Sequence, residues 1–195
     1  MAIQSWTKDI IRLSVIAQDL DNSIVLKTKD HWLMQLISWI LFILAFGQNK
    51  REDFLKRFAT TLCNYHFYPK EWSARAVEAN LCHEARHTKQ FRIFGLGIHP
   101  VLGLPLAAIF YLLFPLPILL AWGRYYMEYD ASRAEFKYKL SVLNYPDRSI
   151  RSDAWHTAQH VSSASYFWAW PRSWAEKSFA KLAEEVINEH QRTTK

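Results

Sequence analysis

The residues best suited to chemistry are the five from His83 to His87, which read His-Glu-Ala-Arg-His. On a helix, side chains four positions apart lie on one face, so His83 and His87 can offer two imidazole nitrogens to one metal ion. Glu84 lies next to this pair, where its carboxylate can take a proton from a metal-bound water molecule. The pattern therefore predicts a hydrolytic zinc site. The alternative is two surface histidines and a glutamate on an ordinary amphipathic helix.

The segment around this motif favours the helix that such a site requires. Residues 73 to 90 contain no proline or glycine and are rich in good helix formers, so we expect a helix from about Ser73 to Gln90. The chain has only two cysteines, Cys63 and Cys82, which are too few for a disulfide scaffold and wrongly spaced for a thiolate zinc site. Cys82 adjoins the first histidine, but neighbouring helical residues point about 100° apart, so we expect Cys82 to be a packing residue.

A third metal ligand is expected from a later helix. Catalytic zinc needs three protein ligands and an open position for water, and a carboxylate on a second helix is a common third ligand. The predicted helix from Arg124 to Glu135 offers Glu128, Asp130 and Glu135. A carboxylate here can equally be a solvated helix charge. Its place after the His-Glu-x-x-His helix favours Glu128.

Before the motif, the run from Phe58 to Pro69 is rich in aromatic and β-branched residues and ends at a proline. This composition predicts a strand closed by a turn into the metal helix. The free edge of such a strand can pair with the extended backbone of a peptide. An ordinary sheet strand is the alternative.

The order of these features resembles the gluzincin metallopeptidases, which have a strand, a His-Glu-x-x-His helix, an apolar insertion and then a Glu-x-(Glu/Asp)-Ala helix. The likeness is strongest to the minimal gluzincins and to the integral-membrane zinc peptidases that process prenylated or misfolded proteins. It covers about Phe58 to Glu135. The two ends of the chain lie outside it.

The resemblance implies a role for each motif residue. His83, His87 and Glu128 would bind Zn²⁺, and Glu84 would be the general base. The third-ligand helix of the family commonly reads Glu-x-Glu-Ala-Asp, whereas this chain has Ser132 at the last position. That departure removes a carboxylate expected to support the metal ligands, which should weaken metal affinity.

Two segments, residues 32–49 and 93–123, carry no formal charge. The first has eighteen residues, the lower limit for a membrane-spanning helix, and a buried core helix or a helix in the membrane interface fits nearly as well. We favour membrane contact. The second has thirty-one residues, too few for two crossings, and the ligands on its two sides must meet at one ion. We therefore expect a proline-bent hairpin that enters one leaflet, packs into the core or docks on a partner.

A second pair of histidines, His156 and His160, follows the predicted ligand helix. It lacks the glutamate of the hydrolytic pattern, so we expect a solvent-facing helical pair. The functional alternative is that His156, His160 or Tyr166 reaches the zinc cleft and donates a hydrogen bond to the developing oxyanion.

Composition limits the possible partners. The chain has 195 residues, a formal charge of +6 and nine tryptophans, and this aromatic content suggests contact with lipid or with a protein. The basic residues are scattered singly, so no nucleic acid is expected. Lys8, Asp9 and Arg12 interrupt any apolar core near the start, so we expect no cleavable signal peptide and synthesis in the cytoplasm.

Together these features predict one metallopeptidase-like domain over residues 1–195, with a mostly helical, zincin-like α+β fold and a small sheet. The expected activity is zinc-dependent hydrolysis of peptide bonds in a peptide or protein substrate, at a membrane or in an assembly. The alternative is a non-catalytic structural or membrane-interacting component of a larger assembly, such as a virus particle, that retains a zinc site. A third possibility is a small membrane-disrupting protein that acts through residues 32–49 and 93–123.

Overall fold

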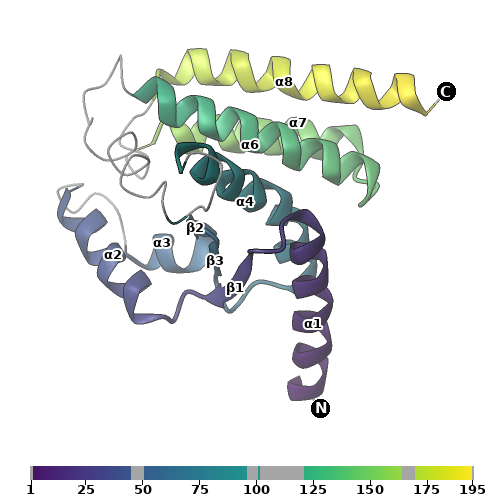
Figure 1. The fold of residues 1–195 in the computed structure, drawn as a ribbon. Coiled ribbons are helices and arrows are strands. Elements are labelled where there is room, and N and C mark those ends of the chain that lie inside the picture. The colour runs from purple at the N-terminus through teal and green to yellow at the C-terminus, as the bar shows by residue number, and fades with distance from the viewer. Residues whose placement is uncertain (1, 45–50, 96–100, 102–120, 164–169, 195) are drawn as a thin grey trace. The chain divides into compact units, whose positions relative to one another are not determined.

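The computed structural model describes residues 2–44, 51–95, 101, 121–163 and 170–194 (Figure 1). The prediction of a mostly helical α+β fold is confirmed, because the described residues are mostly helical and include a small three-stranded sheet. The likeness to a zincin stays a prediction. The chain divides into two compact units, residues 1–104 and 105–195. The single domain expected from the sequence stays a prediction.

The first unit contains the sheet and the helix with the His-Glu-x-x-His motif. The central strand β3 is parallel to β1 and antiparallel to β2, and His66 of β3 lies opposite both Leu26 and Thr61. The elements in chain order are α1 (Ala2–Leu20), β1 (Val25–Thr28), α2 (Trp32–Leu44), α3 (Arg51–Arg57), β2 (Thr60–Leu62), β3 (Tyr65–Tyr68) and α4 (Ala74–Phe94).

The single strand predicted between Phe58 and Pro69 is wrong, because this run forms the hairpin of β2 and β3. A two-residue turn at Cys63 and Asn64 separates the strands, and Cys63 has a left-handed backbone with φ of 59°. The turn contains no glycine, the usual sequence signal for a positive φ. The Asn64 side chain fixes the turn from outside by donating a 2.8 Å hydrogen bond to the carbonyl of Ser23.

The helix predicted from Ser73 to Gln90 is confirmed as α4. Ser73 caps its first turn by accepting a 3.2 Å hydrogen bond from the backbone N–H of Ala76, a typical arrangement for a serine at this position. The helix continues four residues beyond the predicted end at Gln90 and stops before Gly95. It packs on α1, which had no assigned role, through small and aliphatic side chains of a buried core: Leu13, Ala17, Leu81 and Ala85.

In its described residues, the second unit has three helices that lie side by side (Figure 1). They are α6 (Ala121–Ser141), α7 (Asp147–Val161) and α8 (Arg172–Thr193). Phe136 and Phe179 are fully buried in its core. Lys139 of α6 is also buried and forms ion pairs of 2.6 Å with Glu135 and 2.7 Å with Asp153 of α7. Together these contacts fix α6, the helix that carries Glu128.

The apolar segments are only partly described. Residues 32–44 form α2, whereas most of the hairpin predicted for residues 93–123 lies outside the described residues. Among the helices that the structure describes, none combines the length and the apolar character needed to cross a membrane. Membrane contact therefore stays a prediction at this point.

Candidate metal centre

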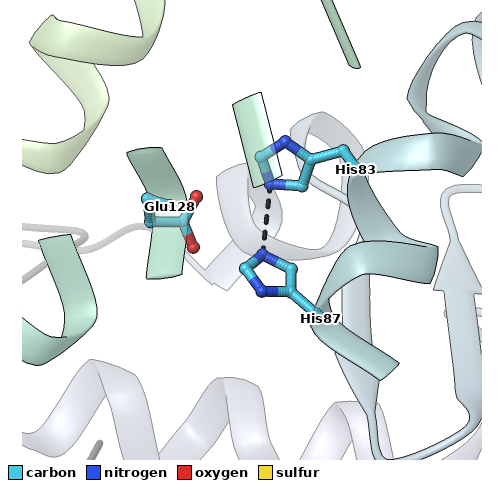
Figure 2. A group of neighbouring side chains, drawn as sticks. All are labelled: His83, His87 and Glu128. Atoms are coloured by element: carbon cyan, nitrogen blue, oxygen red, sulfur yellow. Dashed lines mark hydrogen bonds between the residues drawn. The ribbon is translucent and has the colours of Figure 1, made fainter. Parts of the chain in front are cut away.

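His83 and His87 lie on successive turns of α4 and face each other (Figure 2). Their Nε2 atoms are 3.2 Å apart, and their ring centroids are separated by 4.9 Å. Two nitrogens bound to one tetrahedral zinc at about 2.0 to 2.1 Å lie about 3.3 to 3.4 Å from each other. The spacing of the two imidazoles in this protein therefore fits a shared metal ion without rearrangement of α4.

Gln90 orients one of these imidazoles. Its side-chain oxygen Oε1 lies 2.8 Å from Nδ1 of His87, one turn along the same helix, and both residues are buried. A carbonyl oxygen can only accept a hydrogen bond, so Nδ1 of His87 carries the proton. The lone pair of His87 is then on Nε2, the atom that faces His83, as a metal ligand requires.

The third predicted ligand, Glu128 of α6, belongs to the same group (Figure 2). One potential ligand atom from each of His83, His87 and Glu128 lies within 4.8 Å of the others, so the group can hold a metal ion. The other two candidate carboxylates are not in this group. Of these, Glu135 is engaged by Lys139 at 2.6 Å.

Glu84 is buried and held by strand β2. The hydroxyl of Thr61 donates a 2.6 Å hydrogen bond to Oε2 of Glu84. Strand β2 is at the edge of the described sheet, so no described strand pairs with its outer side. The bond from Thr61 therefore connects Glu84, the predicted base, to this edge strand. The sequence pattern gave no sign of the Thr61 contact.

Lys29 is a buried basic residue of the first unit. Its Nζ donates a 2.7 Å hydrogen bond to the carbonyl of Phe54 and lies 3.7 Å from the centre of the Phe54 ring. Burial lowers the pKa of Lys29 to about 7, and the negative charge of Glu84 opposes this shift. Lys29 and Glu84 therefore interact electrostatically.

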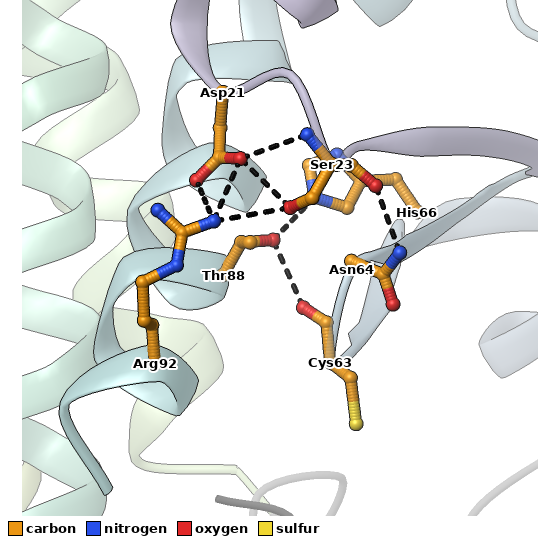
Figure 3. A network of polar contacts seen from close by, with 7 residues as sticks. All are labelled: Asp21, Ser23, Cys63, Asn64, His66, Thr88 and Arg92. Atoms are coloured by element: carbon orange, nitrogen blue, oxygen red, sulfur yellow. Dashed lines mark hydrogen bonds and ion pairs between the residues drawn. The ribbon is translucent and has the colours of Figure 1, made fainter. Parts of the chain in front are cut away.

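A buried hydrogen-bond chain fixes α4 against the hairpin (Figure 3). Thr88 donates to the carbonyl of Cys63 at 2.9 Å, so its oxygen accepts the 2.8 Å bond from Nε2 of His66. Burial lowers the pKa of His66 to about 3, with a further contribution from His87, so the ring is neutral. Because Thr88 follows His87 directly, these hydrogen bonds determine where the His87 side of α4 lies relative to the sheet.

An ion pair fixes the C-terminal end of the same helix (Figure 3). Arg92 contacts the buried carboxylate of Asp21 at 2.8 and 2.9 Å, and Ser23 donates to that carboxylate from its backbone and its hydroxyl. Burial alone would raise the pKa of Asp21, but the bonds from Arg92 and Ser23 hold it below its usual value. The loop between α1 and β1 is thereby attached to α4.

His156 and His160 are described and do not belong to the potential ligand group. His156 is exposed on α7 and packs against the edge of the Trp155 ring, and His160 lies one turn further along α7. Tyr166 lies outside the described residues. Ser132 is fully buried one turn after Glu128, and its hydroxyl forms no hydrogen bond within the part of the chain that the structure describes.

Comparisons with known proteins do not assign the chain to a family. No protein-family model matches it, and no significant match was found among the curated proteins or the solved structures. The function is therefore inferred from the residues of the site.

Proposed function

We propose that this protein is a zinc-dependent peptidase in which His83, His87 and Glu128 bind the metal and Glu84 is the general base. The observation that supports it most strongly is the 3.2 Å separation of the two Nε2 atoms, in a group that also includes a buried carboxylate. Two imidazoles and one carboxylate form a ligand set used by catalytic zinc, with a fourth position left for water. Zinc suits this mixture of nitrogen and oxygen ligands better than calcium or magnesium, which prefer oxygen alone.

Three residues of the first unit support the chemistry. When bound, zinc supplies Lewis acidity that lowers the pKa of a water molecule and polarises the substrate carbonyl. Glu84 takes a proton from the attacking water and passes it to the leaving amine, as a new C–O bond forms and the C–N bond breaks. Thr61 holds Oε2 of this carboxylate, and Gln90 holds the His87 ring in the tautomer that binds metal.

The contact between Thr61 and Glu84 also suggests how the substrate binds. Strand β2 pairs with β3 on one side, and among the described strands none pairs with its other side. An extended peptide that added to this free edge would place its backbone beside the strand residue that orients the base. The proposed substrate is accordingly an unfolded or extended segment of protein.

The substitution Glu84→Gln tests this function. Glutamine keeps the size of the side chain and an oxygen that accepts the hydrogen bond from Thr61, but its amide cannot act as a base. The variant should therefore retain zinc, and its rate of cleavage of an unstructured protein should fall at least about a hundredfold. Glu71→Gln, the same change at an exposed position ahead of α4, should cleave like the wild type. Equal cleavage by Glu84→Gln and the wild type would contradict the mechanism.

A non-catalytic component of a larger assembly is the second candidate function. It is favoured by the large apolar side chains that α2 leaves exposed, which include Trp32 and Trp39. In that case the metal would stabilise the protein without catalysis. Wild-type protein that binds one zinc per chain but cleaves no unstructured substrate would favour this function over the peptidase.

A further inference from the structure

Helix α2 carries an exposed apolar stripe, which we define as Trp32, Leu36, Trp39, Ile40 and Ile43. These positions follow the spacing of one helical face, and each side chain is between 46% and 68% exposed. The opposite face of the helix is covered, since Met34 and Ser38 are at most 1% exposed. Gln35 and Ser38 are the only polar residues of α2, so the helix is apolar on both its covered face and its exposed face. The exposed face leaves a hydrophobic stripe in contact with solvent.

We propose that the α2 stripe binds the surface of an anionic lipid bilayer, with the helix parallel to the membrane plane. The thirteen described residues of α2 extend about 20 Å, and the buried side chains of Met34 and Ser38 attach this length of helix to the rest of the first unit. A helix that is held to the protein on one face and exposes an apolar stripe on the other can insert that stripe at the boundary between headgroups and acyl chains. Tryptophan is enriched at that boundary, and the stripe has two.

The charges beside the stripe favour an anionic surface. The guanidinium of Arg51 stacks over the Trp39 ring at 3.8 Å and donates to Ser38 and Gln35, which are neutral, so its positive charge is not cancelled by these contacts. Lys27 is exposed on β1, close in sequence to the start of α2. The whole chain also has a formal charge of +6. Basic groups next to an apolar stripe complement anionic headgroups.

The stripe is large enough for reversible binding to a bilayer. Its five side chains expose roughly 600 Å² in total, judged from their exposed fractions and the usual areas of such residues. Insertion of a few aromatic and aliphatic side chains with nearby positive charges is sufficient for such binding. An area of this size also matches the apolar part of a protein interface, so the basic groups and the tryptophans, and not the area, favour lipid.

Co-sedimentation of the full chain with vesicles tests this proposal. The wild type should bind vesicles of phosphatidylglycerol and phosphatidylcholine more tightly than vesicles of phosphatidylcholine alone, and salt should weaken the binding. Ile43→Glu, at a position 66% exposed, should weaken binding to the anionic vesicles at least tenfold. Ile11→Glu on α1 is the matched control, because Ile11 is 61% exposed and the charge change is the same, and it should bind like the wild type.

Three results would overturn the proposal. The first is wild-type protein that remains in the supernatant with both kinds of vesicle, as expected if another segment of this chain covers the stripe. The second is equal loss of binding in Ile43→Glu and Ile11→Glu, which would reflect charge alone. The third is a wild-type dimer in sedimentation that Ile43→Glu dissociates without any binding to vesicles, which would assign the stripe to a second copy of the chain.

Discussion

Replacement of Gln90 by leucine should weaken zinc binding although Gln90 is not itself a ligand. Leucine has a similar size but cannot accept the 2.8 Å hydrogen bond from Nδ1 of His87. The proton on Nδ1 would then lose its partner in a buried position, and it could move to Nε2, where it competes directly with the metal. Removal of such a supporting hydrogen bond typically costs ten- to a hundredfold in metal affinity, or about 1.4 to 2.7 kcal/mol.

The magnitude agrees with the burial of the contact. Gln90 is 7% exposed and His87 is 9% exposed, so water cannot readily replace the lost acceptor. A buried donor left without a partner costs about 1 to 3 kcal/mol, which is the same range. Gln90→Glu is the matched control, because a carboxylate accepts the same hydrogen bond and makes the imidazole a stronger ligand. It should bind zinc at least as tightly as the wild type.

Competition with a chromogenic zinc chelator at neutral pH measures these affinities directly. Circular dichroism of each variant should show that the helices are retained. Zinc affinity of Gln90→Leu within twofold of the wild type would refute the role of Gln90. Equal weakening by the leucine and the glutamate variants would show that the effect comes from packing and not from the hydrogen bond.

Three further predictions concern the base, the buried lysine and the second unit. Thr61→Val should reduce cleavage about tenfold with zinc retained, whereas Thr60→Val should not, as measured by turnover and bound zinc. Burial lowers the pKa of Lys29 to about 7, so between about pH 7 and 10.5 the unfolded chain binds more protons than the folded protein does. The free energy of unfolding should therefore rise with pH in this range, by up to about 1.4 kcal/mol per pH unit. Urea titrations of Lys29→Met at several pH values should show that this slope is lost. Lys139→Met removes the cation that Glu135 and Asp153 share, and it should destabilise the second unit by about 3 to 5 kcal/mol in urea titrations. An unchanged midpoint of urea unfolding would contradict this prediction.

Local sequence signals predicted the helix that carries the metal ligands. The absence of proline and glycine indicated α4, and Ser73 begins it as a capping serine. The four-residue spacing of His83 and His87 then placed both rings on one face, because helical geometry alone determines that relation. A carboxylate from a later helix was also expected, and Glu128 is the one of three candidates that belongs to the group.

Contacts between distant parts of the chain could not be predicted in this way. The split of residues 58–69 into two strands depends on the left-handed backbone of Cys63. No glycine is present at this turn to indicate such a conformation in the sequence. Thr61 meets Glu84 across 23 positions, and His66 meets Thr88 across 22, so no local pattern records either bond. Gln90 is different, because its position three residues after His87 on the same helix is a visible signal for a supporting hydrogen bond.

The proposed centre is tested most directly by the zinc content per chain, measured by elemental analysis after dialysis against a weak chelator. The wild type should hold close to one zinc, and Glu128→Gln should hold much less. Asp130→Asn, the corresponding change two residues along α6, should hold as much zinc as the wild type. Wild-type protein without zinc would contradict the metal centre, and full zinc in Glu128→Gln would contradict Glu128 as the third ligand.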